Sequence, residues 1–267
     1  MFRSAAFAVL GLATVAAVAA TPLAAAPFDA AIAGPQRSEA NKARDQYRHP
    51  AETLKFFGIK PNMTVVEIWP SGGWYTEILA PTLNAKGQYI GAHNNPAASA
   101  NAAASVKRFQ DKLAAKPELY GNAKVTAFGK GSAAIAPAGS ADAVVSFRNV
   151  HNWHMAGFAP EAFAAFYAAL KPGGILGIEE HRLPEDKPDE MMKSSGYMKV
   201  SHVKKLAEAA GFKFVAASEI NANPKDTKDY PKGVWTLPPT FEEGDKDKAK
   251  YAAIGESDRM TLKFVKP

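Results

Sequence analysis

Val-Val-Glu-Ile-Trp-Pro-Ser-Gly-Gly-Trp-Tyr-Thr, residues 65–76, passes from a buried strand into a helix. The apolar, β-branched run from Met63 to Ile68 lies between prolines, which is typical of a strand covered on both faces. Gly72 and Gly73 follow it, and a helix is expected over residues 74–79. Glycine lets a backbone approach a ligand, and a helix N-terminus offers free amide donors. The turn is therefore a candidate ligand-binding loop, although a Gly-Gly pair alone also fits an ordinary turn.

Strands and helices alternate along the rest of the chain. Further strands are expected over residues 88–93, 124–128, 142–147, 175–179, 212–215 and 260–265, and helices over 39–47, 50–57, 97–115, 160–170 and 200–210. Such alternation favours a mostly parallel sheet with helices on both faces. We therefore predict the α/β class, with a doubly wound sheet, and a single domain over residues 27–267.

The N-terminus has the pattern of a secretory signal. Arg3 precedes an apolar run from Ala5 to Ala20, and small residues follow at Ala24 to Ala26. This pattern predicts a signal peptide over residues 1–26 and an exported protein, either periplasmic or secreted. A retained membrane anchor is the alternative, but the run is shorter than the roughly 20 residues of a spanning helix. We expect no stable membrane insertion after cleavage.

Composition and charge narrow the class of partner. The formal net charge is +6, and Lys and Arg stand beside Asp and Glu, as in residues 225–229. This is typical of a solvated surface and not of a nucleic-acid-binding stripe, so we expect a small-molecule partner and no nucleic acid. The chain has no Cys, which excludes a lipoprotein anchor and a disulfide framework. The oligomeric state stays open.

Four polar segments follow expected strands. In open α/β sheets, ligands bind beyond the carboxyl ends of the strands. The segments at those ends are residues 67–74, 93–95, 148–154 and 179–182. The third reads Arg-Asn-Val-His-Asn-Trp-His, which is too polar for a core. There His151 and His154 are candidates for proton transfer at neutral pH, and Arg148 and Asn149 for fixing an anionic or carbonyl group.

Several motifs resemble those of one family. Leu170-Lys171-Pro172-Gly173-Gly174 before a strand, Val65 to Gly73, and Ala209-Ala210-Gly211-Phe212 are similar to motifs of the class I S-adenosylmethionine-dependent methyltransferases. The resemblance runs from about Pro50 to the C-terminus. The run from Phe147 to Trp153 resembles, more narrowly, a group of exported, predicted methyltransferases. The family implies a Rossmann-like methyltransferase fold of seven strands, in the order 3-2-1-4-5-7-6 with the seventh antiparallel.

The resemblance also implies a cofactor and its site. S-adenosylmethionine would be held by residues of the first two strand ends: Glu67, Trp69, Ser71, Gly72, Gly73, His93 and Asn94. The family's loop reads E-x-G-x-G-x-G, so Trp69 and Ser71 replace its first two glycines. His93 stands where the family has an acid for the ribose hydroxyls.

The resemblance favours methyl transfer to an unidentified small-molecule acceptor. One alternative is a ligand-binding protein that keeps the fold without catalysis. Another is a metal-binding protein, because His151 and His154 at positions i and i+3 share a helical face and Glu180 or His181 would join them. The preferred interpretation assigns no metal ligand.

Overall fold

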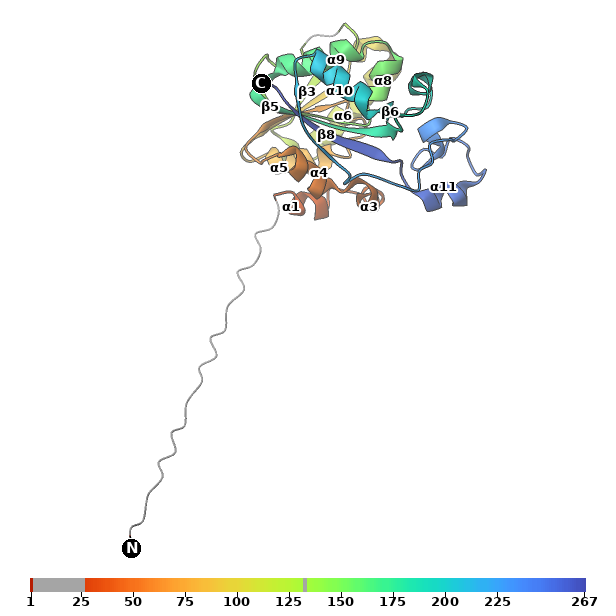
Figure 1. Ribbon diagram of the computed structural model, residues 1–267. Helices are drawn as coiled ribbons and strands as arrows, with labels where there is room; N and C mark the ends of the chain where they lie inside the picture. Colours follow the sequence, from red (N-terminus) through yellow and green to blue (C-terminus); the bar gives the residue numbers. More distant parts are fainter. Residues whose placement is uncertain (2–26, 132–133) are drawn as a thin grey trace.

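The computed structural model describes Met1, residues 27–131 and residues 134–267 (Figure 1). Apart from Met1, the predicted signal segment over residues 1–26 lies outside the described residues. Among the helices that are described, none is long and apolar enough to cross a membrane.

A twisted, mostly parallel sheet forms the centre. Its strands are β1 (Thr64–Ile68), β2 (Gln88–Asn94), β3 (Lys124–Phe128), β4 (Ala141–Phe147), β5 (Leu170–Leu183), β6 (Met198–Lys199), β7 (Lys213–Ser218) and β8 (Arg259–Val265). The order is β3-β2-β1-β4-β5-β8-β7, with β8 antiparallel to both neighbours. This confirms the predicted order. The sheet has one strand more than predicted, because the short β6 pairs with the end of β5.

Helices cover both faces of the sheet. They are α1 (Asp29–Ala33), α2 (Glu39–Lys42), α3 (Asp45–Arg48), α4 (Pro50–Phe57), α5 (Thr76–Leu83), α6 (Ala100–Ala114), α7 (Pro117–Tyr120), α8 (Val150–Met155), α9 (Ala159–Ala169), α10 (Val200–Ala209) and α11 (Lys248–Ile254), with 3-10 turns η1 (Pro96–Ala98), η2 (Asp189–Lys193) and η3 (Gly233–Thr236). Side chains of α8, α9 and α10 share one apolar core with the sheet, and those of α1 and α4 to α7 share the other. This arrangement confirms the predicted doubly wound α/β class.

The strand register brings the candidate segments together. Ile68 at the end of β1 lies beside Ala92 of β2 and Ser146 of β4. Trp69, His93 and Phe147, the residues that come next, therefore meet at one edge of the sheet. We call it the carboxyl edge.

Several elements differ from the predictions, and two of these differences bear on the site. The helix expected over residues 39–47 is two short ones, α2 and α3. Ser38 caps the first by accepting a hydrogen bond from the Asn41 amide at 3.1 Å. Strand β5 starts earlier and runs four residues beyond Glu179, since it pairs with β8 as far as His181 and with β6 at Arg182 and Leu183. This extension carries Glu180 and His181 past the carboxyl edge.

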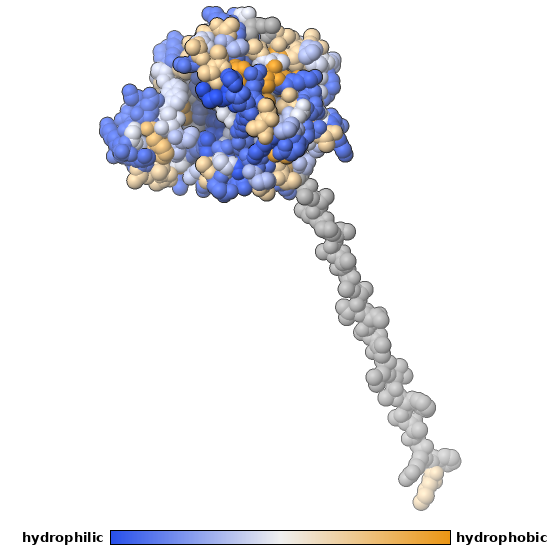
Figure 2. All heavy atoms as spheres, turned by 180° about the vertical axis from the view of Figure 1, so that it is seen from behind, coloured by the Kyte–Doolittle hydropathy of each residue, from blue (hydrophilic) through white to orange (hydrophobic). Residues whose placement is uncertain are grey.

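The segment between β7 and β8 forms a lobe beside the carboxyl edge, and it contains η3 and α11 (Figure 1). Figure 2 shows a mostly hydrophilic surface that is hollowed between this lobe and the rest of the molecule. Because β8 is antiparallel, its first residue, Arg259, lies at the same edge, opposite His181.

Candidate functional site

A crevice opens between the loops that follow β1 and β4. Its cavity has a volume of about 220 Å³ and is lined by Glu67, Ile68, Trp69, Pro70, Ser71, Trp74, Tyr75, Phe147, Arg148 and Asn149. The Asn149 side chain donates a hydrogen bond to the Ile68 carbonyl at 3.0 Å, which ties the two loops together. Of the predicted site residues, this crevice is lined by Glu67, Trp69, Ser71, Arg148 and Asn149, and not by Gly72, Gly73, His93, Asn94, His151 or His154.

The backbone of the β1 loop keeps a conformation that glycine favours. Trp69, Ser71 and Gly73 have φ angles of 47°, 53° and 83°. These are the three positions of the family's glycines, and two of them carry side chains here. A left-handed residue with a Cβ costs about 1–2 kcal/mol, so the surrounding contacts must hold the loop.

The Trp69 indole supplies one such contact. Its Nε1 donates to the Phe128 carbonyl at 2.9 Å, and its ring packs against Phe128, Trp153 and Phe158. The indole is thereby joined to the core beneath α8 and α9. Trp69 fixes the loop in addition to lining the crevice.

His93 supplies another contact, from the end of β2. Its Nδ1 accepts a hydrogen bond from the Asn94 amide at 2.8 Å, so its Nε2 carries the proton and donates to the Ser71 carbonyl at 3.2 Å. The ring is 1% exposed, and burial lowers the pKa of His93. Both ring nitrogens are used within the protein. The half-buried Asn94 side chain, which makes no hydrogen bond among the described residues, is the polar group left to meet a ligand there.

Glu67 is held inside the protein. One carboxylate oxygen accepts hydrogen bonds from the hydroxyls of Thr76 at 2.8 Å and Tyr89 at 2.7 Å. Burial raises the pKa of Glu67 to about 7, despite the opposing effect of these two hydrogen bonds. Glu67 is therefore partly protonated near neutral pH.

Glu67→Gln is expected to stabilise the protein at high pH. The pKa of Glu67 is raised from 4.5 to about 7, so the wild type loses stability as the pH rises between these values. Gln stays neutral and still accepts both hydrogen bonds, so the variant should gain about 2–3 kcal/mol at pH 8 and nothing at pH 4. Urea unfolding at the two pH values measures this, with the exposed Glu39→Gln as control. A variant less stable than wild type at pH 8 would show that Glu67 is ionised and well paired.

A second cavity lies beside the crevice, with Arg148 in both walls. Its volume is about 240 Å³. We call it the arginine cavity, because Arg44, Arg48, Arg148 and Arg259 line it together with His151, Asn152, His181, Val234, Trp235, Pro238, Pro239, Thr240, Glu256 and Ser257. The arginines come from α3 and the residue before it, from the turn after β4, and from the start of β8.

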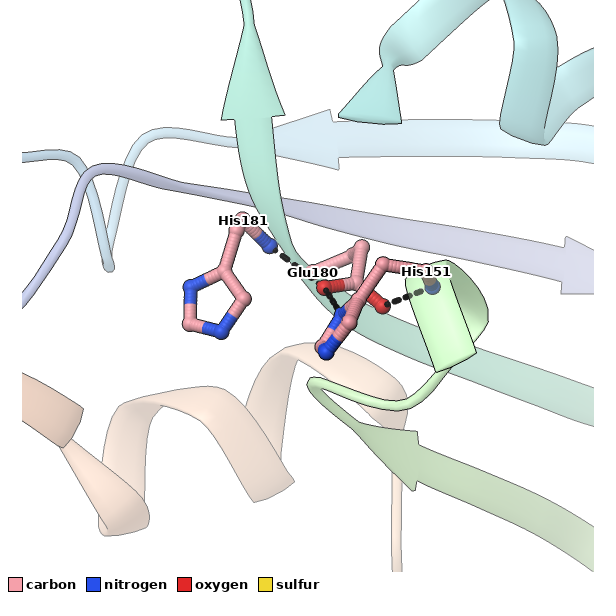
Figure 3. Close-up of side chains that lie close together, drawn as sticks. All are labelled: His151, Glu180 and His181. Carbon is pink, nitrogen blue, oxygen red and sulfur yellow. Dashed lines mark hydrogen bonds and ion pairs between the residues drawn. The ribbon is translucent and has the colours of Figure 1, made fainter. Parts of the chain in front are cut away.

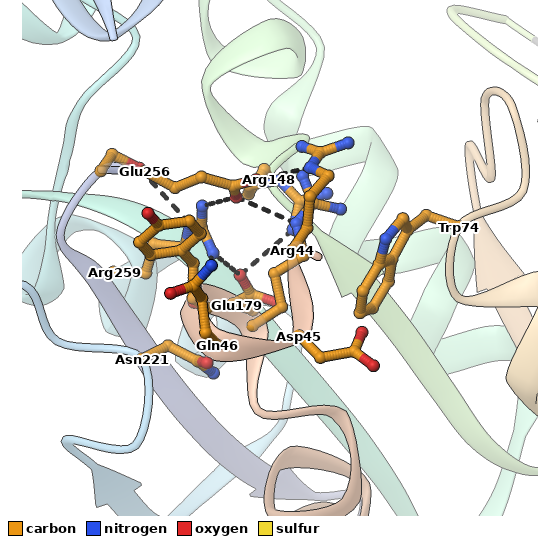
Figure 4. Close-up of polar contacts among 12 residues, drawn as sticks. Arg44, Asp45, Gln46, Trp74, Arg148, Glu179, Asn221, Glu256 and Arg259 are labelled. Atoms are coloured by element: carbon orange, nitrogen blue, oxygen red, sulfur yellow. Dashed lines mark hydrogen bonds and ion pairs between the residues drawn. The ribbon is translucent and has the colours of Figure 1, made fainter. Parts of the chain in front are cut away.

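Two buried carboxylates hold these arginines (Figure 4). Glu256 accepts from the Nε of Arg44 at 2.6 Å and of Arg48 at 2.9 Å, and it also pairs with Arg259. Glu179 lies 3.2 Å from Arg148 and 3.3 Å from Arg259. Four guanidinium groups against two carboxylates leave an excess of two positive charges.

The pKa shifts follow this charge. Burial alone would raise the pKa of Glu256, but the four guanidinium groups, Arg259 first, outweigh burial and hold it well below its usual range. Burial and then the charge of Arg148 lower the pKa of Arg48. For Arg48 the repulsion by Arg148 exceeds the attraction by Glu256, whereas Glu256 and Glu179 raise the pKa of Arg259 in spite of its burial.

His151 enters the arginine cavity from α8 and is oriented by Glu180 (Figure 3). A carboxylate only accepts hydrogen bonds, so the His151 Nδ1 carries the proton and donates to Glu180 at 2.9 Å. Glu180 also accepts from the amides of His151 and His181 at 3.3 and 2.8 Å. The Nε2 of His151 is left without a hydrogen-bond partner among the described residues, with its lone pair available as a proton acceptor.

The structure does not bring His151 and His154 together as the predicted metal pair. Within the described part of the chain, potential ligand atoms of His151, Glu180 and His181 lie within 4.8 Å of one another, and His154 is outside this group. The ring of His154 instead packs on His202, with centroids 4.8 Å apart. Spacing along the helix could not show that the two imidazoles have different neighbours.

Most residues of the arginine cavity were not among the predicted site residues. Arg44 lies in the helix predicted over residues 39–47 and Arg48 follows it, and neither was predicted to belong to a site. Glu256 and Arg259 come before and at the start of the last strand. One signal was available: an antiparallel last strand begins at the edge where the parallel strands end, so its first residues belong to the site.

No protein-family model matches this sequence, and a comparison with curated proteins finds no match either. Solved structures do match. A SAM-dependent methyltransferase from Aquifex aeolicus is 17% identical with a TM-score of 0.57, covering 84% of this chain and 93% of its own. A putative sarcosine dimethylglycine methyltransferase from Galdieria sulphuraria is 13% identical with a TM-score of 0.56, and the match covers 84% of this chain and 85% of the methyltransferase. The fold is that of the class I methyltransferases.

The matches also show the limit of this likeness. The [4+2]-cyclase SpnF is 17% identical with a TM-score of 0.58, covering 88% of this chain and 85% of its own. A protein named for ring formation is thus as similar as the methyltransferases are. At this level of identity the likeness carries the fold, and the reaction has to be argued from the site.

Proposed function

We propose that this protein transfers a methyl group from S-adenosylmethionine to a small-molecule acceptor. The observation that carries the proposal is the β1 loop, where residues 69, 71 and 73 keep left-handed φ angles although only Gly73 is a glycine. A chain that kept the fold alone would have no reason to maintain this strained backbone beside an open crevice. As part of the proposal the protein acts after export, since residues 1–26 have the pattern of a signal peptide.

The residues of the crevice, of the β1 turn and of the adjoining end of β2 fit this cofactor. The Asn94 amide offers both donors and an acceptor for ribose hydroxyls, and Arg148 offers a guanidinium group for the carboxylate of the amino-acid part. At Gly72 an added Cβ would meet nothing within 4 Å, so the backbone of the turn is open to approach. The cofactor, when bound, supplies a methyl group already activated on a sulfonium.

The remaining chemistry belongs to the side chains of this chain. In-line transfer depends mainly on holding the acceptor against the methyl group in a site with little water. Arg148 lines both the crevice and the arginine cavity. The hydrogen bond from Asn149 to the Ile68 carbonyl ties together the loops that follow β1 and β4. His151, with its Nε2 available, accepts the proton when the acceptor attacks through an O–H or N–H group.

Asn94→Asp is expected to tighten cofactor binding. The variant restores an acid at the end of β2, and a charge-assisted hydrogen bond is roughly twice as strong as a neutral one. Calorimetric titration with S-adenosylmethionine and S-adenosylhomocysteine should show about five- to tenfold tighter binding than wild type, equal to about 1 kcal/mol. Asn94→Leu should weaken binding.

Asn95→Ser is the matched control, because Ser can keep the cap that Asn95 gives to the Ala97 amide. It should bind like wild type. If wild type and Asn94→Asp both bind neither compound, the proposed function is wrong and the crevice serves another ligand.

A further inference from the structure

We propose that the arginine cavity binds an oxyanion, a carboxylate or a phosphate group, of the molecule that this protein acts on. Calling that molecule the methyl acceptor rests on the proposed function. The binding of the anion does not, because Arg44, Arg48 and Arg259 line this cavity and not the crevice.

Three of the arginines have hydrogen-bond donors that the protein does not use. Among the described residues, Arg44 and Arg48 each donate only through Nε, and Arg148 only through one terminal nitrogen. Both terminal nitrogens of Arg44 and Arg48, and the second one of Arg148, make no hydrogen bond to the described part of the chain. A guanidinium group presents a planar fork that matches the two oxygens of a carboxylate or phosphate.

The arginines are buried, but nearby carboxylates do not fully neutralise their charge. The side chains of Arg48 and Arg259 are 4% and 1% exposed, and those of Arg44 and Arg148 are 24% and 18% exposed. Burying like charges with too few counter-ions is costly, and a bound anion relieves that cost. The more open Arg44 and Arg148 leave the route by which it enters.

Three observations weigh against a divalent cation in the same place. His151, Glu180 and His181 are close enough to ligate one. However, Glu180 already accepts three hydrogen bonds, and the Nδ1 of His181 pairs with the Ser257 hydroxyl at 2.5 Å. Burial, then the charges of His151 and the nearby arginines, lower the pKa of His181 well below its usual value. A site that disfavours one more proton on His181 also disfavours a dication.

The walls limit the size of the ligand. Val234, Trp235 and two prolines of the lobe close one side, and the Trp235 ring meets His151 edge-on at 5.9 Å. A volume of about 240 Å³ accommodates a small organic acid or phosphate ester. The anion would lie on the arginines with the rest of the molecule near His151 and the crevice.

The test measures thermal stability of the full protein with inorganic phosphate or malonate and without S-adenosylmethionine, against sodium chloride at equal ionic strength. We expect at least one of the two anions to raise the Tm saturably beyond chloride, and the stronger one identifies a phosphate or a carboxylate ligand. Arg44→Met should weaken the binding of that anion at least tenfold, and Arg44→Lys should weaken its binding less. Arg108→Met, at an exposed position of α6, is the control and should leave it unchanged.

Equal stabilisation by chloride, or full anion binding by an Arg44→Met variant whose circular dichroism is native, would overturn the proposal. Failure here differs from failure of the proposed function. Anion binding without cofactor binding keeps the arginine cavity and removes methyl transfer. Cofactor binding without anion binding keeps the proposed methyl transfer and removes the anion site in the arginine cavity.

Discussion

Glu256→Gln is expected to destabilise the protein by about 3–5 kcal/mol, because it leaves buried guanidinium groups without their main counter-ion. Glu256 is 2% exposed and pairs with Arg44, Arg48 and Arg259. It therefore joins the α2–α3 region to the start of β8, two parts of the chain that no strand pairing connects. Gln keeps the shape and one acceptor oxygen but removes the charge.

Urea unfolding at pH 7 measures this loss. The pKa of Glu256 is lowered from 4.5, so its contribution is complete above about pH 4.5 and is lost as the pH falls through the folded-state pKa. The gap between wild type and variant should therefore narrow in acid. Glu219→Gln is the control: Glu219 pairs with Arg182 but is 70% exposed, and its loss should be below about 1 kcal/mol. A loss this small for Glu256→Gln would show that the arginines are solvated and not buried as described.

The same variant connects stability to the arginine cavity. Without Glu256 the excess positive charge grows from two to three, so an anion that binds the cavity should stabilise Glu256→Gln more than it stabilises wild type. If it stabilises both equally, the anion binds elsewhere on the surface.

The sheet was predictable because its strands are nearly continuous apolar runs between turn residues. Residues 65–68 and 143–147 are buried on both faces, and their apolar sequence alone predicts a covered parallel strand. The strand order came from the resemblance, and β3-β2-β1-β4-β5-β8-β7 confirms it. The two-residue β6 has no pattern of its own, because it forms only where β5 overshoots the edge.

The site was less predictable because its contacts join segments far apart in sequence. Trp69 and Ser71 were interpreted as departures from a glycine loop, and only the φ angles show that the loop conformation is kept. His93 was predicted to face the cofactor, whereas the structure shows both of its ring nitrogens engaged by Asn94 and Ser71. Arg44 lies 212 residues from Glu256, a pairing that no local pattern indicates.

His151→Gln is expected to lower turnover by about 10²- to 10⁴-fold, the usual contribution of a general base. The Nδ1–H of His151 donates to Glu180, which leaves Nε2 in the arginine cavity to take the acceptor's proton. Gln can replace the hydrogen bond but not the base. Transfer of radiolabel from S-adenosylmethionine to small hydroxylated or amino-bearing carboxylates and phosphates measures turnover. Binding of the cofactor should not change.

Glu180 and His154 make this prediction specific. Glu180 acts as a positioning residue: in Glu180→Gln a neutral amide oxygen accepts more weakly than the carboxylate, so the proton is held less firmly on Nδ1 and the Nε2–H tautomer gains, which weakens the base without removing the ring. Nitrogen-15 NMR of the His151 ring should report this change of tautomer, a signal that loss of packing alone would not produce. His154→Gln alters the neighbour of His202 and should leave turnover within about twofold, as for a surface change. Equal losses in His151→Gln and His154→Gln would mean that neither imidazole is the base and that both support the fold of α8.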